Sequence, residues 1–135
     1  MNYKVELIDL RARYLEERKE ILKILDATLK KGNLILTPEL EDLEHKISRY
    51  TGSQFCLGLN SGTDALMMAL WACGVKKNDE VITSSLSFVA SAGSIAHLGA
   101  KPVFVDVNDD LNLNPDLIEN LITKKTKAIL PVHWT

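Results

Sequence analysis

One short turn, Asn60-Ser61-Gly62-Thr63-Asp64, concentrates the residue types that could bind a ligand. It follows a short apolar run and precedes a stretch with helical spacing, so a helix would begin at or near Thr63. The first turn of a helix carries unpaired N–H groups and the positive end of the helix dipole. Gly62 would let an anion approach the backbone, and Ser61 and Thr63 would add hydroxyl donors. These residues therefore indicate a phosphate site.

Helix capping is the alternative interpretation of the same turn. Ser, Thr and Asp are common where helices begin, and Gly62 could simply make the turn. The segment is neither a P-loop nor a dinucleotide-binding G-x-G-x-x-G turn. The residues of the turn, taken alone, leave phosphate binding and plain capping both open.

The first 52 residues have the spacing of two helices. Apolar residues recur at helical intervals in both. Each is also followed by a Gly, which is typical of a helix C-terminus. The second helix begins with a Thr-Pro pair, which is typical of an N-terminus. We expect residues 1–52 to form an N-terminal helical segment. The predicted helices run from Asp9 to Leu29, with the stop signal Gly32-Asn33, and from Thr37-Pro38 to Gly52.

From residue 53 onward, apolar runs typical of buried strands alternate with helical stretches. Such alternation with short links predicts a mostly parallel sheet covered by helices, which is an α/β fold. We expect residues 53–135 to form one such region in the order β-α-β-α-β-α-β. The predicted strands are Phe55–Leu59, Glu80–Thr83, Val103–Val107 and Ala128–Val132, and the predicted helices are Asp64–Cys73, Phe88–Leu98 and Asn114–Ile122.

Composition excludes several classes of partner. The formal net charge of the 135 residues is −2, so no basic field favours nucleic acid or an anionic membrane surface. No apolar run approaches the ~20 residues that a membrane span needs. Cys56 and Cys73 form no zinc pattern, and no metal site is expected. The sequence predicts a cytoplasmic protein without a membrane or nucleic-acid partner.

Several motifs resemble those of the DegT-type sugar aminotransferases, which are fold-type I enzymes that use pyridoxal 5'-phosphate. The segment Asn60–Leu66 resembles the phosphate-binding signature of that family. The other resembling segments follow in family order, over nearly the whole chain. They are Ile8-Asp9-Leu10, Gly32–Leu36, Asn78–Thr83, Ser87–Ser91, Gly99–Val107 and Thr126–His133.

The resemblance implies a role for each matching position. The backbone N–H groups around Gly62, Thr63 and Asp64, with the Thr63 hydroxyl, would hold the phosphate of pyridoxal 5'-phosphate. Phe88 would stack on the face of the pyridine ring, the alternative being an ordinary core aromatic. His133 follows the last strand, where a functional role and a plain polar position are both open.

The resemblance also implies a reaction and its partners. The enzyme would move an amino group from an amino acid, glutamate, to a nucleotide-activated keto-sugar in polysaccharide or lipopolysaccharide biosynthesis. It would act as a homodimer with its active sites at the interface. A dehydratase that uses the related pyridoxamine cofactor is a further alternative.

No lysine of the chain matches the family's Schiff-base lysine, and the acidic partner of the pyridine nitrogen also has no counterpart. We therefore expect this chain to be a truncated, N-terminal part of the large domain that is inactive alone, with no catalytic residue assigned. The competing hypothesis is a non-catalytic fragment that serves as an interaction module.

Overall fold

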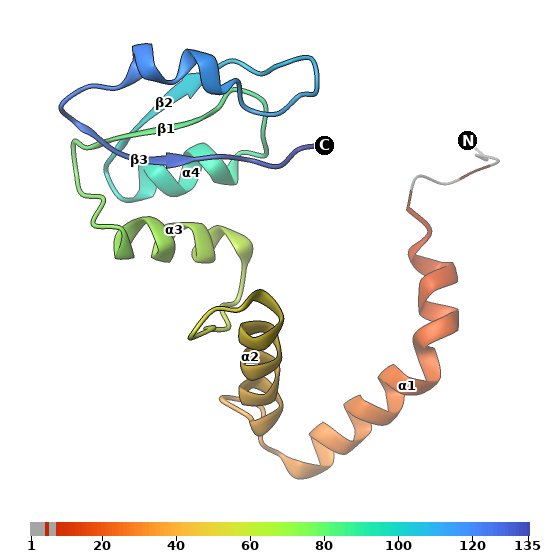
Figure 1. Cartoon of the computed structure of the whole chain (residues 1–135). Helices are drawn as coiled ribbons and strands as arrows, with labels where there is room; N and C mark the ends of the chain where they lie inside the picture. Colours follow the sequence, from red (N-terminus) through yellow and green to blue (C-terminus); the bar gives the residue numbers. More distant parts are fainter. Residues whose placement is uncertain (1–4, 6–7) are drawn as a thin grey trace. The chain divides into compact units, whose positions relative to one another are not determined.

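The computed structural model describes residue 5 and residues 8–135. The chain divides into two compact units, Met1–Gly58 and Leu59–Thr135 (Figure 1). The first unit is helical, and the second contains a sheet with helices. The predicted division into domains at residue 52 stays a prediction.

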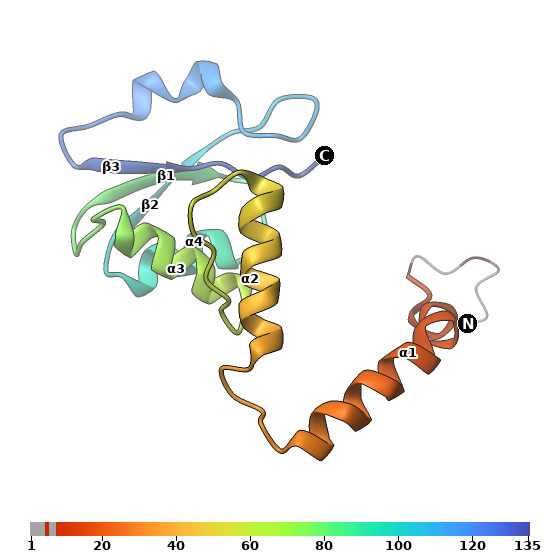
Figure 2. The same cartoon turned by 60° about the horizontal axis from the view of Figure 1, so that its bottom comes forward.

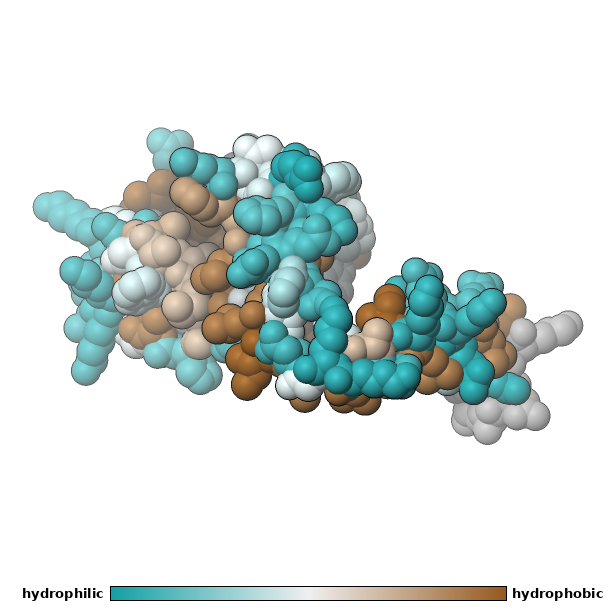
Figure 3. Space-filling model, turned by 90° about the horizontal axis from the view of Figure 1, so that it is seen from below, coloured by the Kyte–Doolittle hydropathy of each residue, from teal (hydrophilic) through white to brown (hydrophobic). Residues whose placement is uncertain are grey.

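The first helix, α1, spans Leu10–Lys31 and has clear signals at both ends. The Asp9 carboxylate accepts a hydrogen bond from the N–H of Ala12 at 2.8 Å, which satisfies one of the free donors of the first turn. Gly32 ends the helix in the left-handed conformation at φ 69°, where a residue with a side chain would be strained. None of the residues of α1 is buried, and Figure 3 shows hydrophobic and hydrophilic residues interspersed on it.

The second helix, α2, spans Pro38–Thr51, and its predicted ends are confirmed. Thr37 is the N-cap, with its side chain accepting from the N–H of Leu40 at 3.4 Å, and Gly52 is the left-handed C-cap. An ion pair between Lys31 and Glu39, 2.6 Å long, spans the turn between α1 and α2.

The expected strand Phe55–Leu59 does not form, so that prediction is wrong. Among the described residues this stretch pairs with no strand, and a strand without a hydrogen-bonded neighbour leaves its backbone groups unsatisfied. The carboxylate of Glu44 instead accepts a hydrogen bond from the N–H of Gly58 at 2.7 Å. Phe55 is 80% exposed. The apolar composition of Phe55–Leu59 therefore does not indicate a buried strand.

The second unit contains a parallel three-stranded sheet, as the α/β prediction requires. Its strands are β1 (Glu80–Ser84), β2 (Lys101–Val105) and β3 (Thr126–Leu130), arranged in the order β2-β1-β3. At the centre of the register, Ile82 of β1 faces Val103 of β2 on one side and Ile129 of β3 on the other. Four of the five residues of β1 are buried because this central strand is covered on both faces.

The two faces of this sheet are covered by different connections. Helix α4 (Ala90–His97) joins β1 to β2 on one face, with α3 (Gly62–Ala72) beside it (Figures 1 and 2). The segment from β2 to β3 crosses the opposite face. Because parallel crossovers are right-handed, a reversal of direction along the sheet moves the connection to the other face. The core between α3, α4 and the sheet contains Leu70, Val75, Val81, Ile95 and Ala100.

The segment from β2 to β3 differs from the predicted helix over Asn114–Ile122. It forms two short 3-10 turns, Pro115–Leu117 and Glu119–Leu121. Asn114 caps the first turn as expected, its side chain accepting from the N–H of Asp116 at 2.9 Å. Forming the first turn of an α-helix costs conformational entropy, and a stretch this short adds few further hydrogen bonds to offset that cost.

Candidate functional site

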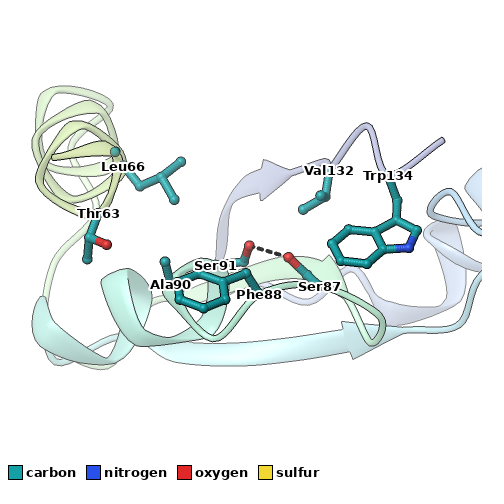
Figure 4. Close-up of a pocket in the computed structure, with 9 residues that line it drawn as sticks. Thr63, Leu66, Ser87, Phe88, Ala90, Ser91, Val132 and Trp134 are labelled. Atoms are coloured by element: carbon teal, nitrogen blue, oxygen red, sulfur yellow. Dashed lines mark hydrogen bonds between the residues drawn. The ribbon is translucent and has the colours of Figure 1, made fainter. Parts of the chain in front are cut away.

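A cavity of about 510 Å³ lies where β1 and β3 end and α3 begins (Figure 4). Strand β1 stands between β2 and β3, whose connections run over opposite faces, and ligands of open α/β sheets bind at such a reversal. The volume falls within the range of about 300–1,000 Å³ that is usual for small-molecule sites. The lining residues are Gly62, Thr63, Leu66, Ser87, Phe88, Ala90, Ser91, Val132 and Trp134.

The first turn of α3 is partly capped by its own side chains. The N-cap is Ser61, whose hydroxyl accepts from the N–H of Asp64 at 3.1 Å and lies 3.1 Å from the Asp64 carboxylate, to which it can donate. The N–H of Ala65 donates to the Ser61 carbonyl. In the described part of the chain, the N–H groups of Gly62 and Thr63 have no recorded partner. The capping interpretation is therefore confirmed for Ser61, and two donors remain for a ligand.

The space beside Gly62 is open to a ligand. A Cβ built on this glycine would meet no atom within 4 Å, so the fold itself does not require a glycine at this position. Thr63 follows it at one end of the cavity, with its hydroxyl directed inward (Figure 4). A phosphate could therefore approach both free N–H groups and the Thr63 hydroxyl.

Phe88 lines the cavity from the segment between β1 and α4. Phe88 is 69% exposed, so it is not a core aromatic. The backbone around it is held in place, because the N–H of Ser91 donates to the Phe88 carbonyl at 3.1 Å. The hydroxyls of Ser87 and Ser91, which flank Phe88 in the sequence, lie 2.6 Å apart and are hydrogen-bonded. An exposed aromatic held this way suits contact with a flat ligand, and stacking by Phe88 stays a prediction.

Sequence reasoning assigned no site role to six of the lining residues, and two of these six, Val132 and Trp134, follow β3. His133, which it singled out, is exposed and does not line the cavity. Successive residues of an extended chain point to opposite sides, so His133 faces away from the cavity that Val132 and Trp134 line. The apolar, polar, apolar order of these three residues was the available signal.

The cavity is apolar with hydroxyl groups, since no ionisable side chain is among the described residues that line it. The carboxyl groups with shifted pKa values serve structural contacts instead. A hydrogen bond from Thr123 lowers the pKa of Glu80, which stands at the amino end of β1, opposite to the cavity. Hydrogen bonds from Asn112 lower the pKa of Asp110.

Among the described residues, no helix combines the length and the apolar character that a membrane span needs. No group of three or more His, Cys, Asp or Glu side chains in that part of the chain is placed to hold a metal ion.

Comparison with known proteins identifies the family. Residues 15–135 match the DegT/DnrJ/EryC1/StrS aminotransferase family, and the chain belongs to it. It is 41% identical over 129 residues to UDP-2-acetamido-2-deoxy-3-oxo-D-glucuronate aminotransferase from Pseudomonas aeruginosa, covering 95% of this chain and 35% of that protein. The chain thus spans about a third of the length of the curated relatives it matches.

Solved structures show the same relationship. The crystal structure of S. venezuelae DesV superimposes with a TM-score of 0.93 at 39% identity, covering 98% of this chain and 36% of that one. Spr1654 from Streptococcus pneumoniae in its PLP form gives a TM-score of 0.79 at 40% identity, covering 85% and 29%. The neighbours support the prediction of a partial fold-type I aminotransferase fold.

Proposed function

We propose that this chain forms the phosphate-binding part of a pyridoxal 5'-phosphate-dependent nucleotide-sugar aminotransferase. The observation that carries the proposal is the start of α3, where the N–H groups of Gly62 and Thr63 border a cavity next to the exposed ring of Phe88. A dianionic phosphate and a flat aromatic ring match these two parts of the site. The PLP form of a structural neighbour supports the choice of cofactor.

The proposal gives each residue a distinct part. The N–H groups of Gly62 and Thr63 and the Thr63 hydroxyl would hold the phosphate. The N–H of Asp64 is engaged by Ser61, so Asp64 would contribute its N–H only after the Ser61 side chain rotates. Phe88 would support the face of the pyridine ring. When bound, the cofactor supplies an electron sink for chemistry at the amino-bearing carbon.

The substrates follow from the relatives. We propose that the complete enzyme transfers an amino group from an amino acid, glutamate, to a nucleotide-linked keto-sugar for polysaccharide biosynthesis in the cytoplasm. The name of the P. aeruginosa relative supports a nucleotide-sugar substrate for that protein. Transfer by this chain itself is not expected, because no lysine is among the described residues that line the cavity. Amino transfer catalysed by the 135-residue chain would contradict that expectation.

A second candidate role is assembly, either as the proposed homodimer or as an interaction module. Helix α1 carries exposed large apolar side chains, and none of its residues is buried. Exposed apolar surface of this kind favours contact with another protein surface. Sedimentation velocity tests self-association, and a chain that stays monomeric at high concentration argues against the homodimer.

Calorimetric titration with pyridoxamine 5'-phosphate tests the cofactor proposal. This compound keeps the ring and the phosphate but has no aldehyde to react with surface lysines. We expect binding, and we expect Thr63→Val to weaken it by roughly tenfold or more, since a hydrogen bond to a charged group contributes about 1.5–3 kcal/mol. Thr51→Val, at the end of α2, is the control and should leave binding unchanged. No binding by the unsubstituted chain would refute the proposal.

A further inference from the structure

Trp134 forms the end of the cavity that is remote from the proposed phosphate site. Figure 4 shows Thr63 at one end, Trp134 at the other and Phe88 between them. Trp134 is 48% exposed, so burial in the core does not explain its position. An exposed aromatic that borders a small-molecule cavity is a candidate for contact with the ligand.

The backbone of Trp134 is held by the side chain of one residue, Asn112. Its Oδ1 accepts hydrogen bonds from the N–H of Trp134 at 2.8 Å and from the N–H of Thr135 at 3.3 Å. Its Nδ2 donates to the carbonyl of Thr135 at 3.0 Å. The amide of Asn112 thus pairs with the chain after β3 much as a neighbouring strand would.

Asn112 is itself fixed by the turn that carries it. The turn is closed by a bridge between Val107 and Leu113 and by the N–H of Asn108, which donates to the Asn112 carbonyl at 2.9 Å. The carboxylate of Asp110 accepts from the N–H of Asn112 at 3.0 Å and from its Nδ2 at 3.2 Å. These contacts point Nδ2 toward Asp110 and leave Oδ1 for Trp134, so the amide has one favoured orientation.

We infer that Trp134 contacts the cofactor ring at the end remote from the phosphate, and that Asn112 is the positioning residue that holds Trp134 there. This inference rests on the proposed function. With the phosphate at Gly62 and Thr63 and the ring over Phe88, the far edge of the ring is directed toward the indole. The indole offers that edge the apolar surface of its six-membered ring, which lies on the side toward Phe88 (Figure 4).

The test follows the two indole N–H signals of the ¹⁵N-labelled chain by NMR, assigned with Trp71→Phe. Trp71 lies in α3 and does not line the cavity. Pyridoxamine 5'-phosphate should shift the Trp134 indole signal several times more than that of Trp71. Inorganic phosphate should shift the Thr63 amide but not the Trp134 indole. An equal response of Trp134 to both compounds would exclude ring contact and overturn the inference.

Substitution of Asn112 tests its positioning role. In Asn112→Ala the shift of the Trp134 indole on adding pyridoxamine 5'-phosphate should fall to less than half, while the Thr63 amide still responds. Asn108→Ala, in the same turn but exposed, is the matched control and should keep the full shift. Asn112→Ser serves the same purpose if the alanine variant unfolds. An unchanged Trp134 response in the Asn112 variants overturns the positioning role.

The two proposals fail in different ways. If pyridoxamine 5'-phosphate shifts the Thr63 amide but leaves the Trp134 indole unmoved, the cofactor proposal stands and the role of Trp134 is refuted. If neither signal moves, the cofactor proposal is refuted, and the role of Trp134 is refuted with it.

Discussion

Replacing Gly62 with alanine separates the needs of the fold from those of the ligand. A Cβ at this position would meet no atom of the chain within 4 Å, and Gly62 is the first residue of α3. Alanine also loses less backbone freedom on folding than glycine does. We therefore expect the free energy of unfolding of Gly62→Ala to be unchanged or raised by up to about 1 kcal/mol.

The same substitution should weaken cofactor binding. The added methyl group would occupy the space through which a phosphate reaches the N–H groups of Gly62 and Thr63. Losing one hydrogen bond to a charged group costs about 1.5–3 kcal/mol, which corresponds to a roughly ten- to hundredfold higher Kd. If the fold required a glycine at position 62, Gly62→Ala would instead lower the free energy of unfolding.

Urea unfolding and calorimetric titration with pyridoxamine 5'-phosphate measure the two effects. Gly93→Ala is the matched control, because Gly93 lies in α4, also has no atom within 4 Å of its built Cβ, and does not line the cavity. It should gain stability and keep its affinity. An unchanged affinity in Gly62→Ala would refute the placement of the phosphate, and a loss of stability would refute the reasoning about open space.

Three other predictions concern the ring contact, the core and an ion pair. Phe88→Leu should weaken pyridoxamine 5'-phosphate binding by about 0.5–1.5 kcal/mol, with little change in the free energy of unfolding measured in urea. The control is Phe104→Leu, at an exposed position on β2, which should leave binding unchanged. Ile82→Ala should lower the free energy of unfolding by about 2–5 kcal/mol, measured in urea, because Ile82 is fully buried; a loss below that range would contradict its central place in the core. The hydrogen bond from Lys31 lowers the pKa of Glu39 from 4.5 to about 2, so their interaction stabilises the fold above pH 4.5 and is lost as the pH falls through about 2. NMR titration should show the pKa of Glu39 returning toward 4.5 in Lys31→Ala, and an unmoved pKa would refute the pairing.

The helix ends could be predicted because their signals are local. The Thr37-Pro38 pair, Gly32 and Gly52 act through hydrogen bonds or backbone conformations within a few residues of themselves. Ser61 is similar, since its hydroxyl reaches only as far as Asp64. The position of the candidate phosphate site at the start of α3 could therefore be inferred before the fold was known.

The features that could not be predicted depend on distant partners. Phe55–Leu59 has the composition of a strand, but composition does not supply the neighbour with which a strand must pair. The far wall of the cavity is similar, because the position of Trp134 depends on Asn112, which belongs to a separate turn. Its indole thus reaches the cavity through contacts that no local motif reveals.

The strand order β2-β1-β3 has a consequence for the sequence of folding events. One helix separates β1 from β2, whereas the whole segment over the opposite face must close before β3 can pair with β1. Closing a longer loop costs more entropy, so we expect β3 to dock after β1 and β2 have joined. Val132 and Trp134 follow β3, and the cavity would then be completed only at the last step. A cofactor would bind the finished fold and slow its unfolding, without guiding the earlier stages of assembly.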